Sequence, residues 1–173
     1  LYDEGVRWTE NVAKLDESLR VLVGDVMVSS SFIAYIAPFN AYFRNELWAK
    51  RWMPDIVERK IPSTEGYSPM MLLTDASTTA GWRTEGLPAD QLSMENAAII
   101  TNCARWPLII DPQLQGVTWI RKRETPNGLS ITQQSQSGYL LKLQKAMEEG
   151  TPLLLENVGE SFDAVMEPVL SRA

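Results

Sequence analysis

The sequence predicts an α/β protein in which a helical lead-in precedes a partial three-layer domain with a parallel sheet. Two observations predict this fold class. Over positions 1–37, apolar residues recur at alternating steps of four and three, which is the spacing of one helix face. From position 91 to 173, short apolar runs alternate with helical patterns, as in a parallel sheet that helices cover on both faces.

The composition excludes several kinds of function. The chain has 173 residues and is 45% hydrophobic, which suits one core of ordinary size. It has no His and one Cys, Cys103, so we predict no catalytic triad, no imidazole metal site and no internal disulfide. Its net charge of −6 argues against a nucleic-acid partner, because phosphate contacts need a basic face. The start at Leu1 and the end inside a helical pattern at Ala173 predict a segment of a longer polypeptide.

The first segment, 1–37, reads as one long amphipathic helix from about residue 7 to its end before Pro38. Its apolar seam consists of Trp8, Val12, Leu15, Leu19, Leu22 and Val26, and resumes at Ile33 and Ile36 after a polar position at Ser29. Two interpretations stay open: a helix lying on a domain core, and one strand of an antiparallel coiled coil. Gly24 makes a bend plausible. Asp25 and the serines at 29–31 interrupt the most apolar stretch, so we predict no membrane span.

The second segment, 38–90, is predicted to be a helical connector. Apolar residues at helical spacing fill 40–60, with an interruption at Pro54. The following stretch is rich in Pro, Gly, Ser and Thr, with short helices expected at 69–74 and 78–83. We expect Tyr67 and Trp82 to fix this connector to a core.

The third segment, 91–173, carries the predicted sheet. Helices are expected at 92–102, with Asp90 as the N-cap, and at 115–123, 137–149 and 163–170. The helix at 137–149 should bury Tyr139, Leu140, Leu143 and Met147. Strands are expected at 106–110, 129–132 and 152–155, because each is a short apolar run bounded by turn residues.

The turn after the first expected strand has the outline of a phosphate-binding loop. Residues 111–118 keep the length, the second Gly and the final Thr of G-x-x-x-x-G-K-[ST], as Gly116 and Thr118. The first Gly is replaced by Asp111, which repels an anion, and the Lys by Val117, which has no charge. Loss of one partner of a close buried charge pair costs about 2–5 kcal/mol. The sequence therefore favours a degenerate loop that binds no nucleotide.

The last expected strand is followed by Glu156 and Asn157, where a nucleoside triphosphatase usually has Asp and then Glu. Asn157 cannot take a proton from water as a carboxylate can. Two alternatives stay open: an atypical nucleotide site in which Lys122 or Arg121 replaces the missing Lys, and an ordinary turn of an unrelated α/β fold.

Other polar and aromatic residues receive structural interpretations. Cys103 is expected to be a buried bystander, Glu95 a surface helix residue, and the basic run 121–123 a solvated last turn of helix, with a docking patch as a minor alternative. The six Trp are expected to anchor cores and interfaces. We predict no catalytic residue and no metal ligand in this chain.

Several motifs, in this order along the whole chain, resemble dynein heavy chains. The stretches that carry the resemblance are 20–26, 85–90, 93–97, 105–116 and 154–157. Among them, the pair Gly24-Asp25, the triplet 86–88 and the triplet 111–113 are the most specific. The residues at 102–107 and 112–116 resemble those of axonemal chains, especially the outer-arm beta type, more than those of cytoplasmic dynein.

The resemblance implies a segment that runs from the base of the microtubule-binding stalk into the fifth AAA+ module of the motor ring. It implies that 1–37 is the stalk-base coiled coil, 38–90 a connector, and 91–173 a partial AAA+ large subdomain whose nucleotide site is degenerate. ATP and Mg would then serve other modules of the same motor. The implied partners are neighbouring AAA+ modules, other dynein subunits and, through the distal stalk, the microtubule. The implied location is the axoneme, with the cytoplasm as the alternative.

The function expected is thus that of a mechanical segment without hydrolysis, which couples the ring to the stalk. The first alternative is an active nucleotide-binding module with an atypical loop. The second is a free-standing helical adaptor formed by residues 1–91.

Overall fold

A computed structural model describes residues 2–171, and contacts divide the chain into two compact units. The first unit comprises 1–81 and 88–107, and the second comprises 82–87 and 108–173. Positions 1, 172 and 173 lie outside the described residues, and so does the predicted chain end inside a helix at Ala173. Each unit is described below by itself.

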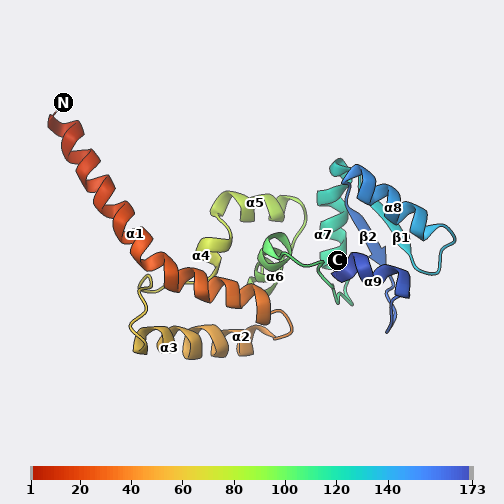
Figure 1. Ribbon diagram of the computed structural model, residues 1–173, viewed down its shortest axis with the longest axis horizontal. Helices are drawn as coiled ribbons and strands as arrows, with labels where there is room; N and C mark the ends of the chain where they lie inside the picture. Colours follow the sequence, from red (N-terminus) through yellow and green to blue (C-terminus); the bar gives the residue numbers. More distant parts are fainter. Residues whose placement is uncertain (1, 172–173) are drawn as a thin grey trace. The chain divides into compact units, whose positions relative to one another are not determined.

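Helix α1 (Tyr2–Tyr35) is the long helix that the heptad spacing predicts. It is one continuous helix that bends near its middle, as Figure 1 shows, and it ends before Pro38 as expected. The predicted seam is exposed from Trp8, at 72%, to Val26, at 43%, whereas its last residue, Ile36, is buried. A different face, which includes Val28 and Phe32, is buried in the core. Ser29, a polar gap in the seam, belongs to this buried face.

By length and composition alone, the stretch of α1 from Glu4 to Tyr35 is apolar enough to cross a membrane. The core helix of a globular protein meets the same criterion. The second half of α1 packs into such a core, and its Asp25 accepts hydrogen bonds from Thr64, which favours the core interpretation.

The core of the first unit forms where helices fold back onto α1. After a turn come α2 (Ala41–Leu47), a π-helical turn (Trp48–Trp52) and α3 (Met53–Glu58). Pro54 lies in the first turn of α3, and the wider π-helical turn just before it keeps the chain helical where the sequence predicted an interruption. Two clusters hold these elements together, one of Val28, Ile56 and Tyr67 and one of Phe32, Ile36 and Ile99.

Short helices complete the connector. Helices α4 (Met70–Leu73) and α5 (Ala76–Thr84) confirm the two predicted short pieces, and both Tyr67 and Trp82 are buried as predicted. Helix α6 (Gln91–Asn102) begins at the predicted N-cap, where the Asp90 carboxylate accepts a hydrogen bond from the Ser93 N–H.

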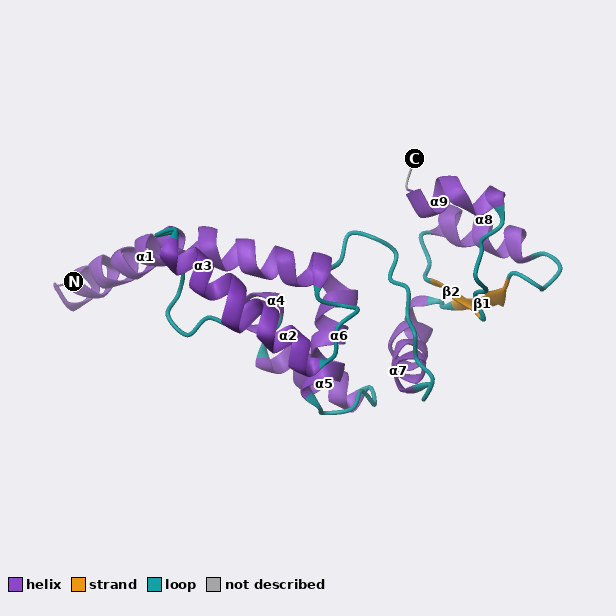
Figure 2. Cartoon of the chain, turned by 90° about the horizontal axis from the view of Figure 1, so that it is seen from below, coloured by secondary structure: helices purple, strands orange, loops and turns teal. Residues whose placement is uncertain are grey.

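The second unit contains the parallel sheet. It comprises α7 (Gln115–Glu124), a 3-10 turn (Thr125–Asn127), β1 (Ser130–Gln133), α8 (Tyr139–Glu149), β2 (Leu153–Glu156), a second 3-10 turn (Ala164–Met166) and α9 (Glu167–Ser171). Strands β1 and β2 pair in parallel, with Ser130 opposite Leu153. Figure 2 shows α7 on one side of the strands and α8 and α9 on the other. The α/β fold class is confirmed.

Two details of the predicted sheet are wrong. Within residues 2–171 the sheet has two strands rather than three, because 106–110 forms no strand. Leu108 and Ile110 in that stretch are exposed, Ile110 at 88%. A lone extended segment gains no ladder hydrogen bonds, so an apolar run becomes a strand only where a neighbour pairs with it. The strands are half-exposed apart from buried Thr132 and exposed Ile131, so the expected double cover is incomplete here.

The predicted inner face of α8 is also partly wrong. Tyr139 is buried and Leu143 is half-buried, but Leu140 and Met147 are exposed, and Ala146 is buried instead. Gly150 follows this helix in the left-handed conformation, with φ of 66°, as is common for a glycine at the end of a helix.

Candidate functional site

The turn predicted to be a degenerate phosphate-binding loop, residues 111–118, lies in the second unit and leads into α7. Leu114 is the N-cap residue of α7 and has a φ of 57°, a conformation uncommon for a residue other than Gly. The Leu114 carbonyl accepts hydrogen bonds from both the N–H and the hydroxyl of Thr118, at 3.1 and 2.5 Å. The loop therefore has the turn-then-helix form that a phosphate cradle uses, although no strand precedes it here.

The carboxylate of Asp111 occupies the anion-binding end of this helix. Its Oδ1 accepts a hydrogen bond from the Gln115 N–H at 3.2 Å, and its Oδ2 accepts one from the Val117 N–H at 2.9 Å. The first N–H groups of a helix have no partner within the helix and are the donors that bind a phosphate. Asp111 thus satisfies these donors with an anion of the chain itself.

The surroundings of Gly116 show how closely this carboxylate approaches. A Cβ atom at Gly116 would lie 3.4 Å from Oδ2 of Asp111, which is tighter than most such contacts. Val117, in the position of the usual Lys, contributes its N–H to Asp111 and brings no positive charge. The loop offers an outer phosphate neither a cation nor these two N–H donors.

The second half of the predicted site, Glu156 and Asn157, follows β2. The Glu156 carboxylate forms an ion pair with the guanidinium of Arg121 on α7. Asn157 is exposed and has a φ of 50°. The structure therefore links the two predicted motifs through Arg121, a contact that the sequence did not indicate.

The two cations proposed as substitutes for the missing Lys are directed elsewhere. Arg121 binds Glu156, and the Lys122 ammonium donates a hydrogen bond to the Thr84 carbonyl at 2.7 Å. Arg123 lies 5.6 Å from the ring centre of Trp119 and pairs with Glu85 at 3.5 Å. The basic run 121–123 forms the last turn of α7 as predicted, with Arg121 and Lys122 exposed, and its side chains also make contacts within the unit.

A tryptophan pair forms the core beside α7. Trp82 and Trp119 are each 1% exposed and meet edge to face, with ring centres 6.1 Å apart. The Trp119 Nε1–H donates to the Glu85 carboxylate at 2.8 Å, whereas the Trp82 Nε1–H has no hydrogen-bond partner in the described part of the chain. Of the six Trp that were expected to anchor cores and interfaces, these two lie in a core, while Trp8 and Trp106 are exposed.

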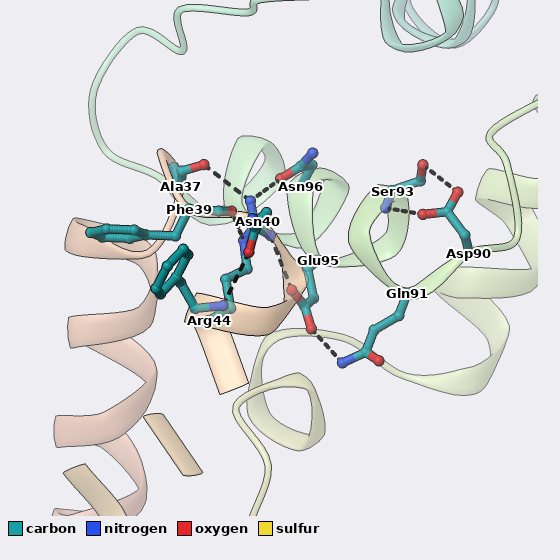
Figure 3. A network of polar contacts seen from close by, with 10 residues as sticks. Ala37, Phe39, Asn40, Arg44, Asp90, Gln91, Ser93, Glu95 and Asn96 are labelled. Carbon is teal, nitrogen blue, oxygen red and sulfur yellow. Dashed lines mark hydrogen bonds and ion pairs between the residues drawn. The ribbon is translucent and has the colours of Figure 1, made fainter. Parts of the chain in front are cut away.

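In the first unit, a buried ion pair joins Arg44 of α2 to Glu95 of α6 (Figure 3). The two residues are 2% and 3% exposed, so the prediction that Glu95 is a surface residue is wrong. The Arg44 guanidinium also donates to the Asn96 side chain and to two backbone carbonyls of the turn after α1, those of Ala37 and Phe39, at 2.6, 3.1 and 2.8 Å. Every oxygen it contacts is an acceptor, as burial of this charge requires.

The remaining candidate residues show no reactive arrangement. The Cys103 thiol is half-buried and lies 3.1 Å from the Arg105 carbonyl and 3.4 Å from that of Ile100. Among residues 2–171, no group of three or more Cys, Asp or Glu side chains is placed to hold a metal ion.

Comparisons with known proteins identify the family. The family described as the ATP-binding dynein motor region matches residues 80–173, and the one described as the microtubule-binding stalk of dynein motor matches residues 1–56. The dynein beta chain of the flagellar outer arm of Chlamydomonas reinhardtii is 49% identical over 99% of this chain. Human dynein axonemal heavy chain 9 and the ciliary dynein beta chain of Tripneustes gratilla are 42% and 43% identical over 99% of it.

The chain spans 4% of the length of each of these three relatives. The two family matches follow one another in the order that the sequence motifs predicted, with the stalk before the motor region. The chain belongs to the dynein heavy chain family.

Proposed function

We propose that this segment is a structural and mechanical part of a dynein motor, which joins the stalk base to an α/β module without binding nucleotide. The observation that carries the proposal is the Asp111 carboxylate, which accepts the N–H groups of Gln115 and Val117. A bound phosphate would need those donors and would meet a negative charge beside them. The absence of a Lys at Val117 acts in the same direction.

The proposed division of labour follows the predicted segments. Residues 1–37 form the stalk base, 38–90 the connector, and 91–173 part of an AAA+ large subdomain with a degenerate site. The exposed apolar seam of α1 supports the first of these roles, because it is a surface that another helix can cover.

For the whole heavy chain, we propose an ATP-driven microtubule motor in the axoneme, since the relatives named above are flagellar, axonemal or ciliary chains. ATP and Mg would bind in other modules of that chain. This segment would contact neighbouring AAA+ modules and other dynein subunits, and would reach the microtubule only through the distal stalk.

The competing function is a nucleotide-binding module with an atypical loop, which the description of the matched motor family favours. It requires a cation over the loop, but Arg121 and Lys122 bind Glu156 and the Thr84 carbonyl instead. It also requires Asp111 to leave the N–H groups that it now accepts.

Photo-crosslinking with an azido-ATP analogue separates these functions in the intact heavy chain. We expect no labelled peptide within 106–123, although other modules are labelled. We also expect Thr118→Ala to leave ATP turnover within about twofold of the wild type, since a residue that binds no phosphate contributes nothing to the reaction.

Thr125→Ala is the matched control, because Thr125 makes the same hydroxyl contact to the carbonyl four residues before it. Labelling of 106–123 that Thr118→Ala abolishes and Thr125→Ala retains would establish the nucleotide-binding function instead.

A further inference from the structure

A short segment, residues 62–67, crosses α1 at its bend; we name it the strap. Three contacts attach it to consecutive turns of the helix. The Gly24 N–H donates to the Pro62 carbonyl at 3.0 Å. The Asp25 carboxylate accepts both the N–H and the hydroxyl of Thr64, at 2.9 and 2.6 Å. Further along, the hydroxyls of Ser29 and Tyr67 lie 2.5 Å apart, and both residues are buried.

Gly24 permits this close approach. A Cβ atom there would lie 2.4 Å from the Pro62 carbonyl oxygen and 2.8 Å from the Ser63 Cβ. Neither distance is compatible with an unmoved strap. By contrast, a Cβ at Gly5, the other glycine of α1, would have nothing within 4 Å. The fold therefore requires a glycine at position 24 of α1 but not at position 5.

The Gly24 N–H has two possible acceptors. In a regular helix it would donate to the carbonyl of Arg20, four residues earlier. Here it donates to the Pro62 carbonyl of the strap, and an outside group that bonds to the helical backbone is a recognised cause of a bend. The helix is mostly exposed before this point and packs into the first unit after it. The bend therefore lies where α1 leaves the unit.

We propose that the strap is a latch that sets the direction in which the exposed half of α1 leaves the first unit. With the latch closed, the Pro62 carbonyl takes the Gly24 N–H and α1 is bent. With the latch open, the Arg20 carbonyl is the only acceptor for this N–H, and α1 straightens. The contacts of the Asp25 carboxylate with Thr64 hold the latch closed.

This assignment accounts for the Gly24-Asp25 pair, whose role the sequence left open. Glycine admits the strap, and the next residue supplies the carboxylate that binds it. The consequence for the motor rests on the proposed function, because the direction of α1 matters there as the direction of the stalk base. The latch itself is a property of the first unit and does not depend on nucleotide at the loop.

The test compares Gly24→Ala with Gly5→Ala in the intact heavy chain. Hydrogen–deuterium exchange should be at least tenfold faster for the Thr64 and Tyr67 amides in Gly24→Ala, because its methyl group displaces the strap. Gly5→Ala should leave those rates at wild-type values. Cryo-electron microscopy of the same variants should show α1 straighter at residue 24 in Gly24→Ala alone.

An unchanged exchange rate of the Thr64 amide in Gly24→Ala would overturn the proposal. So would a Gly24→Ala structure in which the strap is displaced but α1 keeps its bend. Thr64→Val removes only the hydroxyl contact and keeps the side-chain shape, so it tests the same idea if Gly24→Ala does not fold. It should raise the exchange rate of the strap amides about threefold, and an unchanged rate would contradict the assignment. Azido-ATP labelling of 106–123 is not affected by either result, so failure here is distinct from failure of the proposed function.

Discussion

At the scale of single residues, the pair Trp82 and Trp119 provides a test of one hydrogen bond. Both are 1% exposed, but only the Trp119 Nε1–H has a partner, the Glu85 carboxylate. Trp119→Phe should therefore cost about 1–2 kcal/mol more than Trp82→Phe, since a hydrogen bond to a charged group is lost in addition to volume. Native-state hydrogen exchange of the α7 amides measures both costs. Equal costs would show that the bond to Glu85 contributes nothing.

The N-cap of α6 predicts a dependence on pH. Hydrogen bonds from the Ser93 hydroxyl and then from its N–H lower the pKa of Asp90 below its usual value of 3.8. A lowered pKa gives stability that is present above the unfolded pKa and is lost as the pH falls through the folded one. Asp90→Ala should cost about 1 kcal/mol at pH 7 and less below a pH of about 4.

Asp90→Asn is the control, because Asn caps as well but does not titrate. Its stability relative to Asp90→Ala should not change over the same range of pH, as measured by exchange of the α6 amides. If the stability difference from Asp90→Ala falls with pH for both the wild type and Asp90→Asn, the effect belongs to another titrating group.

The sequence predicted part of this residue-scale chemistry. The loss of the Lys at Val117 and the cap at Asp90 are local, so the order of residues indicated them. The pairing of Arg44 with Glu95 is not local, because 51 positions separate the two residues, and no neighbouring residue in the sequence indicated it. For Asp111 the sequence indicated repulsion of an anion, whereas its hydrogen bonds to α7 required the geometry of the turn.

At the scale of elements, the Arg44–Glu95 pair joins α2 to α6. Arg44→Met should lower the free energy of local opening of both helices by about 3–5 kcal/mol, because it leaves the Glu95 charge buried without its partner. Arg44→Met with Glu95→Met should cost less than the sum of the two single changes. Exchange of the α2 and α6 amides gives all three values, and additive costs would contradict a coupled pair.

Helix α1 has a buried apolar face and an exposed one, and a matched pair of changes can separate their contributions. Phe32 is 1% exposed in the core, and Leu15 in the seam is 64% exposed. Phe32→Ala should cost the first unit about 3–5 kcal/mol, whereas Leu15→Asn should change its stability by less than about 0.5 kcal/mol. Amide exchange in α3 measures both, and a large effect of Leu15→Asn would show that the seam packs within this unit.

Periodicity predicted the helices better than the strands. A helix satisfies its own backbone, so the spacing of apolar residues predicted α6 and α7 to within one residue at each end, although α1 begins about five residues earlier than expected. A strand depends on a neighbour, which is why 129–132 and 152–155 were placed within one residue while 106–110 was wrong. The sequence did not indicate that Val28 and Phe32 are buried beside the seam position Ile36, because apolar residues at helical spacing occur on more than one face of α1.

At the scale of the whole molecule, the two compact units have separate cores. Trp119→Ala removes the centre of the second core and should speed exchange of the α7 and α8 amides at least tenfold. The α2 and α3 amides should exchange as in the wild type, because their clusters contain no residue of the second unit. Equal acceleration in α3 would show that the units open together.

Under the proposed function, the Asp111 cap determines how this turn responds while other modules of the heavy chain bind and release nucleotide. A carboxylate tethered three residues from the helix that it caps competes with dissolved anions at an effective concentration of millimolar or above, by the order of magnitude known for short linkers. A dissolved competitor would have to exceed that concentration before it displaced the cap. The conformation of this turn would therefore not change while nucleotide binds to and leaves other modules of the heavy chain.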